Sequence, residues 1–286
     1  MTAEEVIGQV RDALRGIQGI VGVVLGGSRA RGTNREDSDI DIGIYYDEEA
    51  GFDLAAVSEA AKMLDDEHRE NLITPLGGWG PWVNGGGWLV VRGYHVDFLF
   101  RDIRRVSSVI EECLQGNVSS HYQAGHPHAY LNVMYMGELA VCRVLSDSAG
   151  RLAVLKAKTV PYPKAVKDAI AGYFLFEASF SLLLAEKNVD KDDISYVAGH
   201  VFRSVSSLNQ VIFALNEEYC INEKKAVRMI DGFRIKPADY KLRVDHIFTL
   251  IGTDTEKTAQ AIDTLRELVD ETGSLAEHWK GGGMQK

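Results

Sequence analysis

The chain has 286 residues, of which 45% are hydrophobic and 25% charged, a composition that excludes disordered and fibrous proteins and predicts one or two globular domains. Its 31 Lys and Arg residues stand against 41 Asp and Glu residues, so the net charge is −10 and the isoelectric point is near 5.3. Because tracking a phosphate backbone requires a basic surface, we expect no nucleic-acid partner.

Cysteine usage and hydropathy indicate a cytoplasmic protein. Cys113, Cys142 and Cys220 lie far apart and form no CxxC pair, which is typical of reduced thiols in the cytosol. The N-terminus carries charges throughout and has no apolar signal region. The most apolar stretch, 169–185, contains Glu177 and is shorter than the ~20 residues of a membrane span, so it predicts a buried helix.

Helices and strands alternate in the first hundred residues. Apolar positions at helical spacing predict a helix over 3–17, and a β-branched run bounded by glycines predicts a buried strand over 20–26. Acidic and apolar residues alternate over 39–46, as in a strand. The next expected elements are a helix over 53–69, a short strand over 72–75, and two strands within 88–100 that meet at Arg92-Gly93.

After about residue 102, strand signals nearly vanish and helical patterns take over. They cover 102–115, 129–145, 163–187, 193–219, 222–231 and 254–279, with prolines between some of them. The predicted fold class is therefore α+β: a mixed sheet with flanking helices over 1–115, followed by an all-α helical bundle over 116–286.

A glycine-rich turn after the first strand indicates a phosphate-binding site. Gly26 and Gly27 allow the backbone to approach an anion closely, and Ser28 supplies a hydroxyl at the start of a helix. The turn differs from the P-loop of nucleotide-binding proteins, because no Gly-Lys-Ser or Gly-Lys-Thr follows it.

Three carboxylates indicate a metal site opposite this turn. Asp39 and Asp41 are two residues apart on a strand, so both side chains face the same side, and their mutual repulsion favours a cation between them. Asp97 lies in a strand that is otherwise apolar and needs a partner. If Asp97 lies alongside the pair, the three acids form a two-metal site for phosphoryl transfer, with Mg²⁺ as the preferred ion.

In these residues the chain resembles the polymerase-β-type nucleotidyltransferase superfamily. Its signature is a Gly-Ser turn, a gap of about ten residues, an Asp-x-Asp pair and a later third acid. The sequence around Gly27-Ser28 and Asp39-Ile40-Asp41 resembles the small bacterial branch of this superfamily. That branch includes aminoglycoside and lincosamide nucleotidyltransferases and minimal nucleotidyltransferases. The resemblance implies a nucleotidyltransferase-like fold with its catalytic domain in 1–115, and an acceptor-binding role for 116–286.

The resemblance also implies roles for single residues. Asp39 and Asp41 would hold the metals that carry the nucleoside triphosphate, and Asp97 would complete the second metal site and help to deprotonate the acceptor. Gly27 and Ser28 would contact the β- and γ-phosphates. We therefore expect Mg²⁺, and ATP or another nucleoside triphosphate as donor. Further candidates for nucleotide binding are Arg31 and Ser38, although loop arginines such as Arg29, Arg31 and Arg35 are equally compatible with solvated charges.

Outside this set, Glu177 is the candidate that the helical half offers. A carboxyl in an apolar helix has a raised pKa and suits a general base, but a buried Glu is also commonly paired with Arg or Lys. For Lys224 and Lys225 two roles are open: contact with the nucleotide phosphates, or exposure as ordinary surface lysines. In the loop 77–88, which holds six glycines, the tryptophans stack on a ring of a substrate or cover the sheet.

The sequence thus predicts a Mg²⁺-dependent nucleotidyltransferase that moves a nucleoside monophosphate, AMP from ATP in the first instance, to a hydroxyl of a small acceptor such as an aminoglycoside-like antibiotic. Two alternatives remain open at this stage. One is nucleotidylation of a protein or RNA acceptor, as in a regulator or antitoxin, and the other is a non-catalytic nucleotide-binding module. The identity of the acceptor and the oligomeric state are not predicted.

Overall fold

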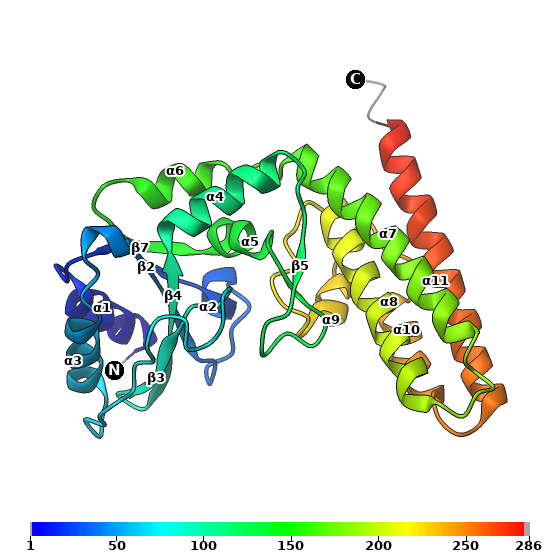
Figure 1. Ribbon diagram of the computed structural model, residues 1–286, viewed down its shortest axis with the longest axis horizontal. Coiled ribbons are helices and arrows are strands. Elements are labelled where there is room, and N and C mark those ends of the chain that lie inside the picture. Colours follow the sequence, from blue (N-terminus) through cyan, green and yellow to red (C-terminus); the bar gives the residue numbers. More distant parts are fainter. Residues whose placement is uncertain (1, 283–286) are drawn as a thin grey trace. The chain divides into compact units, whose positions relative to one another are not determined.

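The computed structural model of the protein describes residues 2–282 and divides the chain into two compact units (Figure 1). We call the first the sheet unit; it comprises Met1–Glu112, His121–Gly125 and Tyr135–Pro161. The second, the helical unit, comprises Cys113–Ser120, His126–Met134 and Tyr162–Lys286. Each unit is described by itself.

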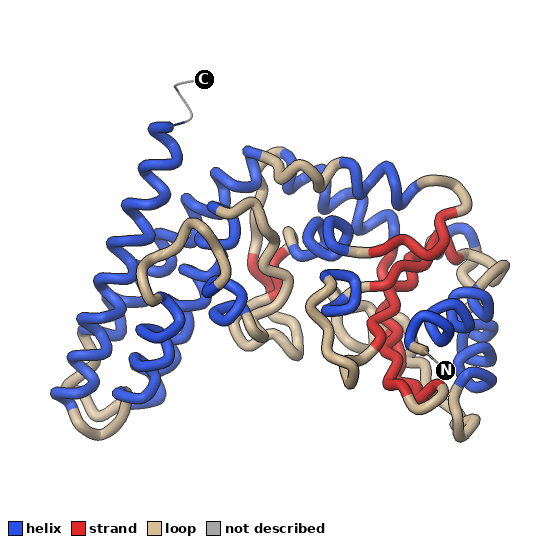
Figure 2. The backbone as a smooth tube through the Cα atoms, turned by 180° about the vertical axis from the view of Figure 1, so that it is seen from behind, coloured by secondary structure: helices blue, strands red, loops and turns tan. Residues whose placement is uncertain are grey.

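A five-stranded mixed sheet forms the centre of the sheet unit, and its strands are drawn in red in Figure 2. The strand order is β3-β4-β2-β1-β7, in which β2 and β4 run parallel and the other neighbouring pairs run antiparallel. The bounds are β1 (Ile20–Leu25), β2 (Ile40–Tyr46), β3 (Gly86–Val91), β4 (Tyr94–Asp102) and β7 (Arg143–Asp147).

Two helices, α1 (Ala3–Leu14) and α3 (Leu54–Leu64), cover one face of this sheet, as Figure 1 shows. Thr2 caps α1, because its hydroxyl accepts from the backbone N–H of Glu5 while the Glu5 carboxylate accepts from the backbone N–H of Thr2. The apolar stripes of both helices pack on the even-numbered residues of β2 and β4, and the core contains Val6, Val10, Leu14, Val57, Ala61, Ile40, Ile42, Ile44, Val96, Phe98 and Phe100.

The remaining helices of the sheet unit are short or lie beyond its apolar core. They are α2 (Gly27–Arg31), the 3-10 helix η1 (Glu48–Ala50), α4 (Ile103–Leu114), whose last residues pass into the helical unit, α5 (Met134–Val141) and α6 (Arg151–Ala157). Asp47, buried at the end of β2, accepts hydrogen bonds from Arg104 at 2.8 Å and from Arg151 at 2.9 Å. These two ion pairs fix α4 and α6 to the sheet.

The sheet unit extends further along the chain than the sequence predicts. The helix expected over 129–145 is replaced by the shorter α5 and by β7, which pairs with β1 as an edge strand. The following helix α6 packs its Leu152 where a Cβ on Gly22 would come within 2.5 Å. The last segment of the sheet unit therefore ends at Pro161, because β7 and α6 complete the sheet, while the domain boundary at 115 stays a prediction.

The helical unit is built from five helices and carries its own core. Their bounds are α7 (Lys164–Glu186), α8 (Ile194–Leu215), α9 (Ala226–Asp231), α10 (Tyr240–Leu250) and α11 (Thr255–Gly282), and the short strands β5 (Ser120–His121) and β6 (Tyr130–Leu131) precede them. Of these, α10 was not expected from the sequence. The all-α bundle predicted for the second half is otherwise present.

Helix α7 contains the apolar stretch 169–185. In the described part of the chain it is the one helix long and apolar enough to cross a membrane by length and composition, a test that core helices of globular units also pass. Its inner face is buried in the bundle through Val166, Ile170, Phe174, Ala178 and Leu182. That packing agrees with the helix of a bundle core.

Candidate functional site

The predicted phosphate turn lies directly against Asp41. The backbone N–H of Gly26 donates to the carbonyl of Asp41 at 2.8 Å. Gly27 follows with a φ of +59° and begins α2, and a Cβ on Gly27 would lie 1.7 Å from Oδ2 of Asp41. Only glycine lets the turn and the carboxylate approach so closely. The predicted turn and Asp41 are in contact because residue 27 has no side chain.

Asp41 and Asp97 are direct neighbours on parallel strands. The register pairs Asp41 of β2 with Asp97 of β4, and neighbouring strands are about 4.8 Å apart. Side chains alternate along each strand, and the flanking Ile40 and Ile42 point into the core. Both carboxylates therefore lie on the opposite face of the sheet, and Asp39, two residues before Asp41, faces the same side. This face is partly exposed around the three acids, and we call that part of it the open face.

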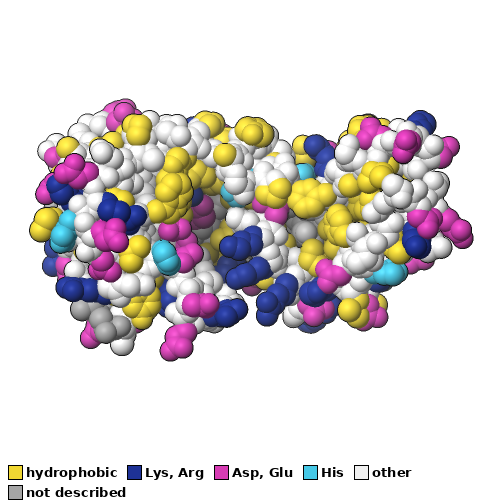
Figure 3. All heavy atoms as spheres, turned by 90° about the horizontal axis from the view of Figure 1, so that it is seen from below, with side chains coloured by type: hydrophobic (Ala, Val, Ile, Leu, Met, Phe, Trp, Pro, Cys, Tyr) yellow, Lys and Arg dark blue, Asp and Glu magenta, His cyan; other side chains and the backbone are white. Residues whose placement is uncertain are grey.

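Burial and like charge shift the titration of Asp97. This carboxyl is half-buried, and no hydrogen bond to it is found within residues 2–282. Burial raises its pKa, and the nearby charge of Asp39 raises it further, while His95 acts in the opposite direction. On the surface of the sheet unit, which lies on the left of Figure 3, acidic and basic side chains are mixed. A cation beside Asp97 would offset both unfavourable terms.

The three carboxylates fit Mg²⁺ by donor chemistry, since hard oxygen ligands suit this ion. The described residues nevertheless contain no group of three or more His, Cys, Asp or Glu side chains close enough together to hold a metal ion. Asp41 and Asp97 are adjacent, whereas Asp39 is exposed at the entrance of β2. The expected convergence of all three carboxylates is therefore not complete, and a bound ion would have to draw them together.

Arg29 has a structural task that sequence reasoning missed. Its Nη2 donates to the carbonyls of Ser38 at 2.6 Å and Glu36 at 3.2 Å, and its Nε donates to the carbonyl of Asp39 at 3.1 Å. These bonds tie α2 to the loop that leads into β2. Arg29 thus positions the backbone of Asp39, a role that carries no recognisable sequence signal.

The two further nucleotide-binding candidates lie close to the turn. Ser38 uses its hydroxyl to accept the backbone N–H of Arg35 at 2.9 Å, which closes the loop before β2. Arg31 is half-buried at the last residue of α2. Their contacts with a nucleotide, like the metal roles of the three acids, stay predictions.

The tryptophans of loop 77–88 differ in their exposure. Trp82 is buried between the ring of His121, at a centroid distance of 4.1 Å, and the guanidinium of Arg105, at 4.4 Å from its ring. Trp79 and Trp88 stack on each other at 4.6 Å, and Trp88 is 62% exposed. Trp82 therefore belongs to the core, and Trp88 is open to a ligand.

The expected raised pKa of Glu177 is wrong. Arg203 of α8 forms a hydrogen-bonded ion pair with Glu177, and this contact lowers the pKa of the carboxyl although burial opposes the shift. Ser181 donates a second hydrogen bond at 3.3 Å. A carboxylate held ionised by an arginine is a weaker general base, so the pairing reading of Glu177 is the one that the structure supports.

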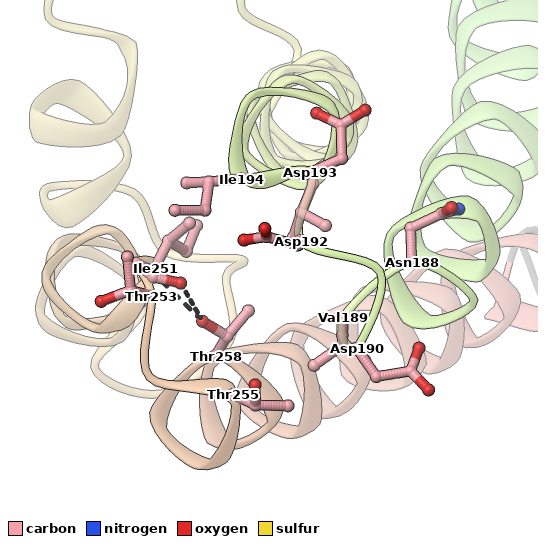
Figure 4. Close-up of a pocket in the computed structure, with 12 residues that line it drawn as sticks. Asn188, Val189, Asp190, Asp192, Asp193, Ile194, Ile251, Thr253, Thr255 and Thr258 are labelled. Carbon is pink, nitrogen blue, oxygen red and sulfur yellow. Dashed lines mark hydrogen bonds between the residues drawn. The ribbon is translucent and has the colours of Figure 1, made fainter.

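A pocket of about 100 Å³ in the helical unit is assembled from helix ends, as Figure 4 shows. It lies between the α7–α8 turn and the α10–α11 turn. Asp193 at its rim caps α8 by accepting the backbone N–H of Tyr196 at 3.1 Å, and Thr258 donates to the carbonyl of Gly252 at 3.2 Å. None of the predicted site residues lines it.

Lys224 and Lys225 are exposed near the start of α9.

Comparison with known proteins supports the interpretation of the sheet unit. Residues 7–115 match the family model described as a nucleotidyltransferase domain. No curated protein matches the chain significantly. A solved nucleotidyltransferase-like protein from Exiguobacterium sibiricum is similar over 93% of this chain and 74% of its own, with 10% sequence identity and a TM-score of 0.43. A likeness of this degree says nothing about substrates.

Proposed function

We propose that the protein moves a nucleoside monophosphate from a nucleoside triphosphate to a hydroxyl of a small acceptor, because residues 7–115 match the family model of a nucleotidyltransferase domain. We take AMP from ATP as the first donor to test. The observation that carries the proposal is the register that aligns Asp41 with Asp97, with Gly27 packed against Asp41.

On the donor side, the Gly27-Ser28 turn binds the β- and γ-phosphates. Its backbone approaches the phosphate oxygens without obstruction by a side chain, and the Ser28 hydroxyl donates a hydrogen bond to one of them. Asp39, Asp41 and Asp97 would hold Mg²⁺, which would neutralise phosphate charge and orient the triphosphate. Arg29 keeps Asp39 in place through its three backbone contacts.

On the acceptor side, Asp97 receives the proton of the attacking hydroxyl. The hydroxyl oxygen forms a bond to the α-phosphorus as the bond from this phosphorus to the bridging oxygen breaks, and pyrophosphate leaves in line.

The acceptor that this surface favours is hydroxyl-bearing and cationic. The net charge of −10 and the row of acids attract cations to the open face of the sheet and repel a phosphate backbone. Aminoglycoside-like compounds combine both properties. We place the reaction in the cytoplasm, without a membrane or nucleic-acid partner, in keeping with three buried cysteines that form no disulfide in the described residues.

The proposal is tested by incubating the protein with Mg²⁺, each of the four nucleoside triphosphates, and a panel of aminoglycosides, lincosamides and simple sugars. Pyrophosphate release reports turnover, and mass spectrometry of the acceptor identifies the product. We expect a small acceptor to gain a nucleoside monophosphate. If only a protein or RNA gains the nucleotide, the small-acceptor proposal is wrong, and if neither does, nucleotidyl transfer is wrong.

A further inference from the structure

Trp88 lies in line with the carboxylates of the site. The β3–β4 register pairs Trp88 with Asp97, and the β2–β4 register pairs Asp97 with Asp41. All three side chains consequently lie in one row across three adjacent strands, on the open face. Gly27 borders the row at Asp41, so Trp88 stands at its other end, beyond Asp97 as seen from the phosphate turn.

Trp79 and the loop around it hold the Trp88 ring in place. The two rings stack with centroids 4.6 Å apart and an interplanar angle of 27°. Trp79 fits above β3 because Gly86 has no Cβ; a Cβ there would lie 2.7 Å from Cζ3 of Trp79. The carbonyl of Trp79 accepts a hydrogen bond of 2.5 Å from Nε2 of Gln123. Trp88 is thus an oriented ring that nevertheless remains 62% exposed.

We propose that Trp88, oriented by Trp79, is the surface on which the acceptor of this transferase stacks, and that it selects an amine-bearing, hydroxylated ring. The inference rests on the proposed function, because it needs a donor phosphate at the Gly27 turn. The acceptor then approaches from the opposite end of the row, where its hydroxyl meets the phosphorus next to Asp97.

Two features of the row favour a cationic ring over a nucleobase. The π face of an indole attracts ammonium groups, and carboxylates stand one and two strands away in the same register. The base of the donor nucleotide is less well placed, because its triphosphate is anchored at the far end of the row. A neutral sugar would gain the contact with the ring but not the attraction of the charges.

Full-length protein is titrated by calorimetry with a non-cleavable α,β-methylene analogue of ATP in Mg²⁺, and then with kanamycin, streptomycin and spectinomycin. The variants are Trp88→Ala, Trp88→Phe, and Met63→Ala as control, an exposed apolar residue on α3 at the other face of the sheet. We expect Trp88→Ala to weaken binding of at least one amine-bearing ring about tenfold, Trp88→Phe to weaken it less, and Met63→Ala to have no effect. The analogue should bind all four proteins alike.

The outcomes separate this inference from the proposed function. If wild type binds the analogue but none of the three rings, or if Trp88→Ala leaves their binding unchanged, the inference is overturned and the proposed function stands. Weaker binding of the analogue to Trp88→Ala assigns the ring to the nucleobase and also overturns it. A wild type that does not bind the analogue at all contradicts the proposed function, and the inference fails with it.

Discussion

The sheet unit contains two groups of acids in opposite electrostatic settings. Beside the turn of the β3–β4 hairpin, Asp65 is fully buried and accepts hydrogen bonds from Arg69 at 2.6 Å and from the backbone N–H of Val90 at 2.9 Å. These contacts hold the pKa of Asp65 far below its usual range. On the open face, burial and the charge of Asp39 raise the pKa of Asp97. The fold supplies Asp65 with hydrogen-bond donors, whereas the charge of Asp97 would be stabilised by an external cation.

The hydrogen-bonded acids beside the turn hold the hairpin that carries Asp97. Asp65 binds Val90 near the end of β3, and its neighbour Asp66 accepts hydrogen bonds from the backbone N–H groups of Arg92 at 2.7 Å and Gly93 at 2.8 Å, the two residues of the hairpin turn. The hairpin carries Asp97 on β4 and Trp88 on β3. Hydrogen bonds to Asp65 and Asp66 at its turn therefore hold the two strands on which the candidate site depends.

The largest effect is expected where an open-face acid is neutralised. Asp41→Asn should lower kcat/KM for nucleotide transfer by at least about 1,000-fold, because one carboxylate that binds the cation is lost. Pyrophosphate release in Mg²⁺ measures it, and Glu59→Gln, an exposed acid on α3, is the matched control with an unchanged rate. Turnover of Asp41→Asn within tenfold of wild type would refute the metal role.

Removing the hydrogen-bonded acid Asp65 should instead lower the stability of the fold. Asp65→Ala leaves the Val90 N–H and the Arg69 guanidinium without their acceptor, so the free energy of unfolding should fall by about 3 kcal/mol. Because the folded pKa of Asp65 is depressed, its stabilisation is present above the unfolded value of about 3.9 and is lost as the pH falls. Urea denaturation measures the loss. A change below about 1 kcal/mol would contradict the prediction, because it would mean that Asp65 contributes no more than an exposed surface ion pair.

The phosphate turn is expected to have an intermediate effect. Ser28→Ala deletes one hydroxyl donor to a charged oxygen, worth about 1.5–3 kcal/mol, so the Kd for the Mg²⁺ complex of an ATP analogue should rise at least about tenfold. Unfolding should be unaffected, since Ser28 lies at the start of the short helix α2 outside the core. Unchanged nucleotide affinity would reduce the turn to a structural element.

Neutralising Asp97 should stabilise the metal-free protein. The raised folded pKa of Asp97 means that its ionised form opposes folding above that pKa, so Asp97→Asn should unfold at a higher urea concentration than wild type at pH 7. The difference should vanish below the unfolded value of about 3.9, where the wild-type carboxyl is protonated in both states. Asp65→Asn serves as the comparison, because it should shift stability in the opposite direction. Destabilisation by Asp97→Asn at pH 7 would show that this acid has a partner in the fold.

The smallest effect is expected in the helical unit. Glu177→Gln removes an ion pair whose arginine is half exposed, so the free energy of unfolding should fall by less than about 1 kcal/mol. The transfer rate should stay within about twofold, because the lowered pKa of Glu177 argues against proton transfer at this residue. A loss of more than a hundredfold in rate, with an intact fold, would restore Glu177 as a general base.

The parts of the fold that sequence predicts well are those with local patterns. The strand before Gly26, the alternation around Asp41 and the hairpin at Arg92-Gly93 are all where the sequence places them. β7 was missed because its residues, RVLSD, are largely polar and half-exposed at a sheet edge, so no alternation distinguishes them from the preceding helix. The pairing with β1 that defines β7 is a long-range contact.

The site shows the same division between local and long-range information. The acids and the glycine turn could be found by spacing, but the exposure of Trp88 follows from its register opposite Asp97. The pKa of Glu177 was predicted in the wrong direction because Arg203, 26 residues later, reaches it from a neighbouring helix. Charge partners set by packing cannot be read from the residue and its neighbours alone.

The central claim is that the open-face acids and the Gly27 turn together bind a divalent cation and a nucleoside triphosphate. Its most direct test is the loss of the free Mn²⁺ signal in electron paramagnetic resonance, with Mn²⁺ replacing Mg²⁺ and the α,β-methylene ATP analogue present or absent. The account predicts that wild type binds Mn²⁺ more tightly with the analogue than without it, and that Asp41→Asn abolishes the protein-dependent binding. Equal binding of Mn²⁺ by wild type and Asp41→Asn would contradict it.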